Sequence, residues 1–458
     1  MFSACNLSYY FYDLSKPNVL VLGASFEFEP FLELLLKEQV NVLCMDRSPA
    51  LSAEFINRWD GRLVCLAQDF SDLQKTFDIV RDYAISHIAA LPVGRALIIM
   101  GKLSDQLGFN SPSFAIIDTM TDKKAFHHFL SEQGLEDYQW SFLDSKACRE
   151  LRAHFDDLEQ KFGYPFIIKP VEGSGSMGAA LISDRSDLEE YRLPERFISG
   201  GALAETALEG EEFCCAGFID GESHFHIMTL LGKEVSKPPY RQESAYFSVP
   251  REREAAIITQ YAELIARRIG LRSSFLTVDA YVTPDDRCFF IDIAPRLTGN
   301  NVLLAALYNG NNPLHIFRKV MIDGQNFCCR SNPQPAVIRF FDFEDSHPVV
   351  FSGSPVNGSW GSPLPAMDES FNVLTIEAPE KGLEMFTPEE RKHIIAFENN
   401  LEAGKSYGAL HNGGDLARGY IMARGATLEQ ADALTRRYIE AIRKSSRDQS
   451  QHQSVMAG

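Results

Sequence analysis

The stretch from Phe166 to Ser183, FIIKPVEGSGSMGAALIS, carries the clearest chemical signature of the chain. Gly173, Gly175 and Gly178 have the G-x-G-x-x-G spacing of loops that approach phosphates closely, because a residue without a Cβ lets the backbone come near a ligand. The loop follows one β-type run and leads into a second, AALIS. We therefore predict a strand–glycine loop–strand hairpin, a flap whose amides close over phosphate oxygens.

Other glycine-loop sites do not fit this context, although an ordinary glycine-rich turn remains an alternative. A dinucleotide-binding turn must open a helix, whereas this loop leads to a strand. The segment does not end in the Gly-Lys-Ser or Gly-Lys-Thr of a Walker A loop, and the chain lacks the H-R-D and D-F-G motifs of a protein kinase. Lys169, on the strand that enters the loop, places a positive charge beside the predicted flap.

Two further β-type runs, TVDAYV at 277–282 and FFIDIAPR at 289–296, each carry one aspartate. On neighbouring strands, Asp279 and Asp292 would bring two carboxylates to one ion. Such oxygens suit Mg²⁺, which bridges the β- and γ-phosphate oxygens in phosphoryl transfer. Arg296, just past the second run, adds a fixed fork of N–H donors that suits an anionic group. Taken singly, each residue is equally typical of a surface ion pair.

The first part of the chain alternates between strand and helix patterns. Strand patterns lie at 18–22, 41–45 and 87–93, and helix patterns at 28–38 and 72–84. This alternation predicts an open α/β sheet with helices on both faces. The loop after the first run, GASFEF, lacks a full glycine fingerprint, so we predict no dinucleotide site there.

From about residue 118 the pattern changes to short β-type runs separated by glycines, which favours antiparallel or mixed sheet. A helix is expected over 121–135, with Asp122 as a helix start, and a long amphipathic helix over 251–270. Near the end of the chain another helix is expected after Thr427 as N-cap. The polar residues 447–458 predict a flexible tail.

Four segments occur in the order that they have in the ATP-grasp ligases, and the chain resembles that superfamily over most of its length. They are TDKKAF, PFIIKPVEGSGSMG, AETALEGEEF and the strand pair TVDAYV and FFIDIAPR. The segment 413–431 is similar to the C-terminal piece of the L-amino-acid ligase branch. The resemblance implies an α/β and α+β multidomain fold: an N-terminal open α/β (pre-ATP-grasp) domain at 1–117, an ATP-grasp core at 118–325, a C-terminal α+β domain at 326–446 that completes the active site, and the tail at 447–458.

The resemblance also implies ATP and Mg²⁺ as cofactors, with Mn²⁺ as a substitute, and a role for each matched residue. Lys169 would lie near the adenine and the α-phosphate, Glu205 and the backbone near Leu208 would read the adenine amine, and Glu212 would hold the ribose hydroxyls. The full implied set is Lys123, Lys169, Gly173, Ser174, Gly175, Ser176, Gly178, Glu205, Leu208 and Glu212 for ATP, Asp279 and Asp292 for metal, and Lys169 and Arg296 for catalysis.

Two departures from the family pattern concern the metal strand. The family usually reads Glu-x-Asn-x-Arg, and this chain has Asp292, Ala294 and Arg296 at those positions. Ala294 has no ligating group, so a second metal ion would lose a ligand or take one from water or from Asn300. Aspartate is also one methylene shorter than glutamate, which matters for a metal with strict bond lengths. These changes indicate either a specialised substrate or a weakened catalyst.

The loop KPPYRQESAYFSVP at 237–250 is a candidate for substrate binding. By analogy with the family it would line the acceptor site, where Arg241 would bind a substrate carboxylate and Tyr246 would lie nearby. Asn300 is a third candidate for a substrate contact. An exposed loop without such a role explains the same residues equally well.

The composition limits the class of protein. A net charge of −18 argues against coating nucleic acid or an anionic membrane, because phosphate surfaces attract clustered Lys and Arg. No run reaches the ~18 apolar residues that cross a bilayer. Nine scattered cysteines without C-x-x-C spacing are typical of reduced thiols in a cytoplasmic protein. We expect small-molecule substrates, neither nucleic-acid nor membrane partners, and an assembly that is open to a homodimer.

The function predicted from these features is that of an ATP-dependent carbon–nitrogen ligase. A carboxylate, by resemblance that of an amino acid or a related metabolite, would be phosphorylated to an acyl phosphate and then transferred to an amine. Two alternatives stay open: a bicarbonate-activating carboxylase of the same superfamily, and a non-catalytic ATP-binding protein.

Overall fold

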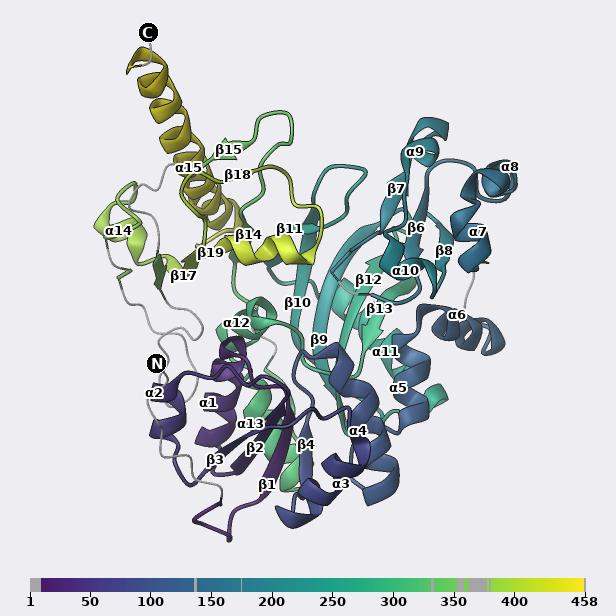
Figure 1. Cartoon of the computed structure of the whole chain (residues 1–458), viewed down its shortest axis with the longest axis vertical. Helices are drawn as coiled ribbons and strands as arrows, with labels where there is room; N and C mark the ends of the chain where they lie inside the picture. The colour runs from purple at the N-terminus through teal and green to yellow at the C-terminus, as the bar shows by residue number, and fades with distance from the viewer. Residues whose placement is uncertain are drawn as a thin grey trace.

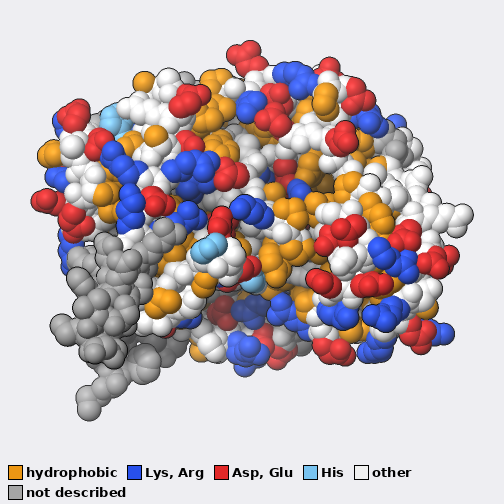
Figure 2. Space-filling view, turned by 90° about the horizontal axis from the view of Figure 1, so that it is seen from above, with side chains coloured by type: hydrophobic (Ala, Val, Ile, Leu, Met, Phe, Trp, Pro, Cys, Tyr) orange, Lys and Arg blue, Asp and Glu red, His pale blue; other side chains and the backbone are white. Residues whose placement is uncertain are grey.

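The computed structural model describes residues 10–135, 138–173, 175–330, 333–351, 358–360, 377–378 and 380–456. Their strands form a four-stranded N-terminal sheet, a small four-stranded sheet, a large nine-stranded sheet that runs through the middle of the molecule and a two-stranded sheet of β15 (Val349–Val350) and β18 (Ser406–Tyr407) (Figure 1). Acidic and basic side chains are interspersed over the face shown in Figure 2. In the described part of the chain, every helix is too short or too polar to cross a membrane.

The N-terminal sheet is parallel, with the strand order β3-β2-β1-β4. Its strands are β1 (Asn18–Leu22), β2 (Asn41–Asp46), β3 (Leu63–Ala67) and β4 (His87–Ala89), and its helices are α1 (Glu29–Lys37), α2 (Ala53–Arg58), α3 (Leu73–Asp82) and α4 (Gly94–Leu107). Val19 and Val21 pack in one core cluster with α1, and Leu20 and Leu22 pack in another with α3 and α4. Both faces are thus covered, which confirms the predicted open α/β architecture.

The second part begins with α5 (Phe114–Thr121) and α6 (Lys123–Glu132). As predicted, Asp122 caps α6, because its side chain accepts a hydrogen bond from the backbone N–H of Ala125. The small antiparallel sheet follows, with the order β5-β8-β6-β7. Its elements are β5 (Trp140–Leu143), α7 (Ser145–Arg149), η2 (Leu151–His154), α8 (Phe155–Phe162), β6 (Phe166–Pro170), β7 (Ala180–Ile182), α9 (Arg185–Glu190), α10 (Glu195–Ile198) and β8 (Ala202–Thr206).

The glycine loop joins two paired antiparallel strands. Phe166 of β6 lies opposite Ile182 of β7, and Ile168 lies opposite Ala180. This pairing confirms the predicted strand–loop–strand hairpin. A helix does not follow the loop, so the dinucleotide interpretation is excluded on geometry as well as on sequence.

The large sheet has the order β13-β12-β9-β10-β11-β14-β19-β17-β16 among the described strands. They are β9 (Glu211–Ile219), β10 (Phe225–Val235), β11 (Glu243–Ser248), β12 (Ser274–Val282), β13 (Cys288–Ala294), β14 (Ala336–Phe340), β16 (Gly358–Trp360), β17 (Ile394–Asn399) and β19 (Gly419–Arg424). Since β11 pairs with β14, one sheet spans the boundary predicted between residues 325 and 326. The C-terminal strands β14, β16, β17 and β19 therefore extend the large sheet.

Helices cover this sheet on both sides. The remaining elements are η1 (Phe26–Phe28), α11 (Glu252–Ile269), α12 (Asn300–Tyr308), α13 (Pro313–Phe317), η3 (Arg318–Ile322), β15 (Val349–Val350), α14 (Pro388–Arg391), β18 (Ser406–Tyr407), η4 (Gly413–Arg418) and α15 (Leu428–Met456).

Thr427 caps α15 as predicted, because its hydroxyl accepts from the N–H of Gln430. However, α15 continues to Met456 through the segment predicted to be a flexible tail. That segment contains neither Pro nor Gly before residue 456 to end the helix.

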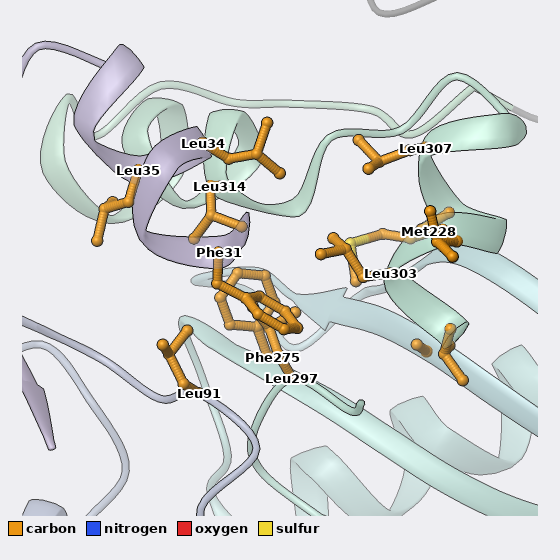
Figure 3. Packing of buried hydrophobic residues seen from close by; sticks show 14 of the residues in the cluster. Phe31, Leu34, Leu35, Leu91, Met228, Phe275, Leu297, Leu303, Leu307 and Leu314 are labelled. Carbon is orange, nitrogen blue, oxygen red and sulfur yellow. The ribbon is translucent and has the colours of Figure 1, made fainter. Parts of the chain in front are cut away.

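The main core joins the N-terminal sheet to the large one. Phe31 of α1 is 1% exposed and packs in one cluster with residues of β12 and α13. Figure 3 shows Phe31 beside Phe275 and Leu297, with Leu314 above it. Because Leu297 directly follows Arg296, this packing fixes the N-terminal domain against the chain segment that carries the predicted catalytic arginine.

Replacement of this phenylalanine should therefore destabilise the whole molecule. We expect Phe31→Ala to lower the free energy of unfolding by about 3–5 kcal/mol, through lost burial and the cavity left behind. Urea unfolding followed by circular dichroism measures this loss. Leu14→Ala is the matched control, since Leu14 is 77% exposed and its loss should change stability by less than about 0.5 kcal/mol. Equal effects of the two variants would contradict the packing described.

Candidate active site

A cavity of about 370 Å³ lies between the β6–β7 hairpin and the ends of β9, β10, β12 and β13. Its walls come from both the small sheet and the large sheet, whose strands lie next to each other in Figure 1. The structure brings most of the predicted site residues to this one cavity: Lys123, Lys169, Gly173, Gly175, Ser176, Glu205, Leu208, Glu212, Arg241, Asp279 and Asp292.

On the small-sheet side, Glu205 of β8 is held by two cationic or polar partners. Lys169 Nζ on β6 lies 2.8 Å from Glu205 Oε2, and His127 Nε2 on α6 lies 2.8 Å from Oε1. Burial alone raises the pKa of the Glu205 carboxyl, but Lys169 and His127 outweigh it and lower the pKa to about 2. The carboxylate thus stays ionised and fixes Lys169, which also donates to the Ile291 carbonyl oxygen at 3.2 Å.

On the large-sheet side, the Glu212 carboxylate receives three partners. Lys233 Nζ lies 2.8 Å from Oε1, Arg241 Nη2 lies 2.7 Å from Oε2, and the Tyr281 hydroxyl donates to Oε2 at 2.9 Å. Burial raises the pKa of Glu212, yet Lys233 and Arg241 lower it further than burial raises it. The result is an anionic acceptor whose position is fixed from β10, β12 and the loop after β10.

The two predicted metal ligands lie opposite each other. Asp279 of β12 and Asp292 of β13 are cross-strand partners in the antiparallel pair, with a bulge directly after Asp279. Burial, together with the charges of Glu212 and Asp292, raises the pKa of Asp279 to about 6 although Lys233 lies 3.2 Å from it and acts in the other direction. Carboxylates directly opposite each other destabilise a sheet unless a cation lies near them.

The donor set fits a hard divalent cation. Lys123 Nζ, at 3.8 Å from Asp292 Oδ1, only partly balances these acids. Within the described ranges, groups of three or more His, Cys, Asp or Glu side chains arranged to hold a metal are absent. The two aspartates would therefore share Mg²⁺ with oxygens of a bound ligand or of water, as is usual for this ion.

Arg296 lies behind the cavity wall rather than in it. Its Nη1 donates to the Leu297 carbonyl oxygen at 2.9 Å, and its buried Nε has no hydrogen-bond partner in the described part of the chain. Burial lowers the pKa of the guanidinium, whereas the charges of Asp292 and Asp279 raise it. The next amide, Leu297 N–H, donates to the Ala90 carbonyl oxygen at 3.1 Å, so a loop of the N-terminal domain reaches this corner of the site.

Some predicted residues lie elsewhere. Tyr246 lies outside the cavity lining, with a ring that is 6% exposed and packs edge-on against Phe340 at a centroid distance of 5.9 Å, so its substrate contact stays a prediction. Arg241 lies in the cavity beside Glu212 rather than at a separate acceptor site. Gly178 lies outside the cavity lining and adjoins Pro170 and Pro194.

Two predicted positions fall outside what the structure describes. Ser174 of the glycine loop is one of them. Asn300 begins α12, but its side chain belongs to the undescribed part, so its proposed metal contact is not placed. Ala294, at the position where the family carries a ligand, packs its methyl group against the second N-terminal core cluster.

Three residues of the site were not found from the sequence. Lys233 and Tyr281 both reach Glu212, and His127 reaches Glu205. A signal existed for two of them, since His127 lies one helical turn after Lys123 and Lys233 interrupts an apolar strand pattern. Their partners lie far away in the chain, so the pairing itself leaves no local pattern.

The comparisons with known proteins agree with this geometry. Residues 162–303 match the family model of the ATP-grasp domain. The L-arginine-specific L-amino acid ligase of Bacillus subtilis is 22% identical over 280 residues, which cover 58% of this chain and 64% of that protein. A D-alanine–D-alanine ligase of Neisseria gonorrhoeae (strain NCCP11945) is 22% identical over 157 residues, or 32% of this chain and 51% of the relative. The chain thus spans about half the length of the first curated relatives it matches.

Among solved structures, the L-amino acid ligase from Bacillus licheniformis is similar with a TM-score of 0.67. That likeness covers 93% of this chain and 97% of the other, at 16% sequence identity. At this identity the likeness establishes the fold, a multidomain α/β architecture built around an ATP-grasp domain.

The depressed pKa of Glu205 makes stability depend on pH in a defined window. Above pH 4.5 the carboxyl is ionised in both folded and unfolded chains, so its full contribution is present. Below that pH the unfolded chain takes up a proton that the folded chain does not accept until about pH 2. We expect this group alone to remove about 1.4 kcal/mol of stability per pH unit in that window.

Urea midpoints between pH 5 and pH 3 measure this dependence. Glu205→Gln should show a shallower decline than the wild-type protein over that range. Glu222→Gln should keep the wild-type decline, because that side chain is 83% exposed. An unchanged slope in Glu205→Gln would contradict the assigned ion pair with Lys169.

Proposed function

We propose that this chain, which contains an ATP-grasp domain, is an ATP-dependent ligase that joins a carboxylate to an amine and releases ADP and phosphate. The observation that carries the proposal is that predicted site residues from distant segments meet in one cavity. Lys123, Lys169, Glu212 and the aspartate pair come from separate segments, yet all line one cavity under the glycine flap. Chance rarely brings phosphate-binding, ribose-binding and metal-binding chemistry to one pocket.

The nucleotide base and ribose would occupy the cavity between β8 and β9. Because the Glu205 side chain is taken by Lys169 and His127, we assign the adenine contact to the backbone that follows it, up to Leu208. Glu212, an ionised acceptor, would take the ribose hydroxyls. Lys169 and Lys123 would contact the phosphates from one side, and Gly173, Gly175 and Ser176 of the flap would cover them from the other.

The metal would be held by Asp279 and Asp292 between the two aspartate strands. Mg²⁺ held there would neutralise negative charge on the phosphates. On the same side Lys233 is a second cation; burial lowers its pKa, but Asp279 and Glu212 raise it well above the usual value. It would therefore stay protonated and face the triphosphate as a fixed positive charge.

The reaction we infer has two steps. A substrate carboxylate oxygen attacks the γ-phosphorus, the bond to the β,γ-bridging oxygen breaks, and ADP leaves with that electron pair. The amine nitrogen then attacks the acyl carbon, the phosphate group leaves, and the amine loses one proton to the solvent. Arg296 would favour the oxyanion by its charge from behind the cavity wall, because it lies beside the aspartate pair and its Nε has no hydrogen-bond partner among the described residues.

We propose amino acids or related metabolites as substrates, because the relatives include ligases of L- and D-amino acids. A phosphate-release screen with amino-acid pairs, followed by mass spectrometry of products, tests this. Amide or dipeptide products would support the proposal. Release of ADP that depends on bicarbonate alone would indicate a carboxylase instead. ATP binding without ADP formation under any of these conditions would indicate a binding protein.

The metal assignment makes a separate prediction. Asp279→Asn and Asp292→Asn should each lower Mg²⁺-dependent ADP release by at least about 100-fold, since each removes half of the anionic ligand set. Coupled ADP assays over a range of Mg²⁺ concentrations measure this. Asp285→Asn is the matched control, because Asp285 lies on the turn of the same hairpin with a 64% exposed side chain. Its activity should stay within about twofold of wild type.

A contrary result would be full turnover in both Asp292→Asn and Lys169→Ala. The lysine variant should raise the KM for ATP more than it lowers kcat, because Lys169 would bind the nucleotide in the ground state and the transition state alike. Intact kinetics in both proteins would show that the cavity is not the reaction site.

A further inference from the structure

The tip of the glycine flap touches a loop from the far end of the chain. The N–H of Gly413 donates to the Gly175 carbonyl oxygen at 2.7 Å. A Cβ on Gly413 would lie 2.8 Å from Gly175 Cα, and a Cβ on Gly175 would lie 2.9 Å from Gly413 Cα. Distances under 3.0 Å to backbone atoms do not occur for real Cβ atoms, so this contact requires glycine on both sides.

The two glycines differ in their own conformations. Gly175 has φ +63°, the left-handed region that favours glycine in any surroundings. Gly413 lies outside that region and begins the short helix η4. An alanine at 413 would therefore suit its own backbone, and the approach of the flap is what excludes it.

The loop that carries Gly413 is held firmly in place. Asn412 caps η4 by accepting from the Gly414 N–H, and Asp415 completes the cap from within the helix. The preceding His411 stacks on Tyr240 with ring centroids 4.0 Å apart, and its Nε2 lies 2.9 Å from Asp345 Oδ2. The η4 loop thus has anchors that do not involve the flap, namely its own cap and the contact of His411 with Asp345.

A second loop, residues 236–242, links this contact to the cavity. The Ser176 hydroxyl donates to the Arg241 carbonyl oxygen at 3.3 Å, and the Leu181 N–H donates to the Pro239 carbonyl oxygen at 3.1 Å. The Arg241 side chain reaches Glu212 in the cavity, and Tyr240 of the same loop stacks on His411. The flap, this loop and the η4 loop therefore form one junction above the proposed nucleotide site.

We propose that Gly413 is a positioning residue, and that the η4 loop is the seat that holds the glycine flap closed over the bound nucleotide. The inference rests on the proposed function, since it needs a nucleotide under the flap. It gives the C-terminal segment a direct part in the site: the flap closes onto a backbone hydrogen bond from Gly413. Without that seat the triphosphate would stay open to water and leave sooner.

Gly413→Ala tests the seat from a position outside the cavity lining. With Mg²⁺ and a non-hydrolysable ATP analogue bound, we expect the amide at position 413 and the flap peptide 175–182 to exchange hydrogen about tenfold faster than in the wild-type protein. Release of a fluorescent ADP should accelerate by a similar factor, which is the size expected for one lost hydrogen bond and its displaced neighbours. The analogue should still protect the peptide around Glu205.

Two further variants make the result specific. Gly221→Ala is the matched control, because its Cβ would meet only Ser273 Oγ, at 4.0 Å, on a distant turn; its exchange and release rates should equal those of wild type. The double variant Gly175→Ala/Gly413→Ala should release nucleotide no faster than Gly175→Ala alone, because both changes break one contact.

The outcomes separate the two proposals. Wild-type protection of the flap and of residue 413 in Gly413→Ala, with nucleotide bound near Glu205, would overturn the seat and leave the ligase proposal standing. Absence of nucleotide protection around Glu205 in the wild-type protein would overturn the proposed function, and the seat with it. Faster exchange at 413 with wild-type thermal unfolding would support the seat and exclude a general loss of fold.

Discussion

The site depends on one electrostatic constraint: a carboxylate taken out of water must have a cation beside it. Glu205 and Glu212 are both nearly buried, and each is ionised only because lysine or arginine side chains oppose the effect of burial on its pKa. Such pairs contribute little net stability, since the cost of desolvating both charges offsets their attraction. These pairs do fix the positions of their side chains, however. Here they hold Lys169 at one side of the cavity and the Glu212 carboxylate at the other.

The fold meets this constraint by facing two sheets toward each other. Lys169 and Glu205 lie on adjacent strands of the small sheet, while Glu212, Lys233 and Asp279 lie on adjacent strands of the large one. Alternation along a strand sends the residues between them, such as Phe213 and Val278, into the core under α11. The face of the large sheet that lines the cavity is thus backed by an apolar core. The Phe31 cluster packs the N-terminal domain against the same sheet.

Local patterns were enough to predict the parts of the site that a short segment encodes. The glycine hairpin and the strands carrying Asp279 and Asp292 follow from spacing and alternation, and the ATP-grasp resemblance joined them into one site. Contacts between distant segments could not be predicted in this way. Nothing near Lys233 identifies Glu212 as its partner, and nothing in the polar segment 237–250 shows that the strand β11, which carries Tyr246, begins inside it. In the sequence, Gly413 is only the first residue of a C-terminal segment that resembles the amino-acid ligases. Its contact with Gly175 joins residues that lie far apart in the chain and leaves no local pattern.

The charges of the cavity also bear on what can enter it. Its described lining carries seven carboxylates, Glu172, Glu205, Glu209, Glu212, Glu243, Asp279 and Asp292, against four cations, Lys123, Lys169, Lys233 and Arg241. A nucleoside triphosphate is a polyanion, and an acidic pocket of low dielectric would repel it. Entry becomes favourable only if a divalent cation accompanies the phosphates and meets the aspartate pair, whose opposed carboxylates and raised Asp279 pKa are relieved by the same ion. If the proposed nucleotide binds here, the electrostatics of these residues therefore favour a divalent cation that enters with it.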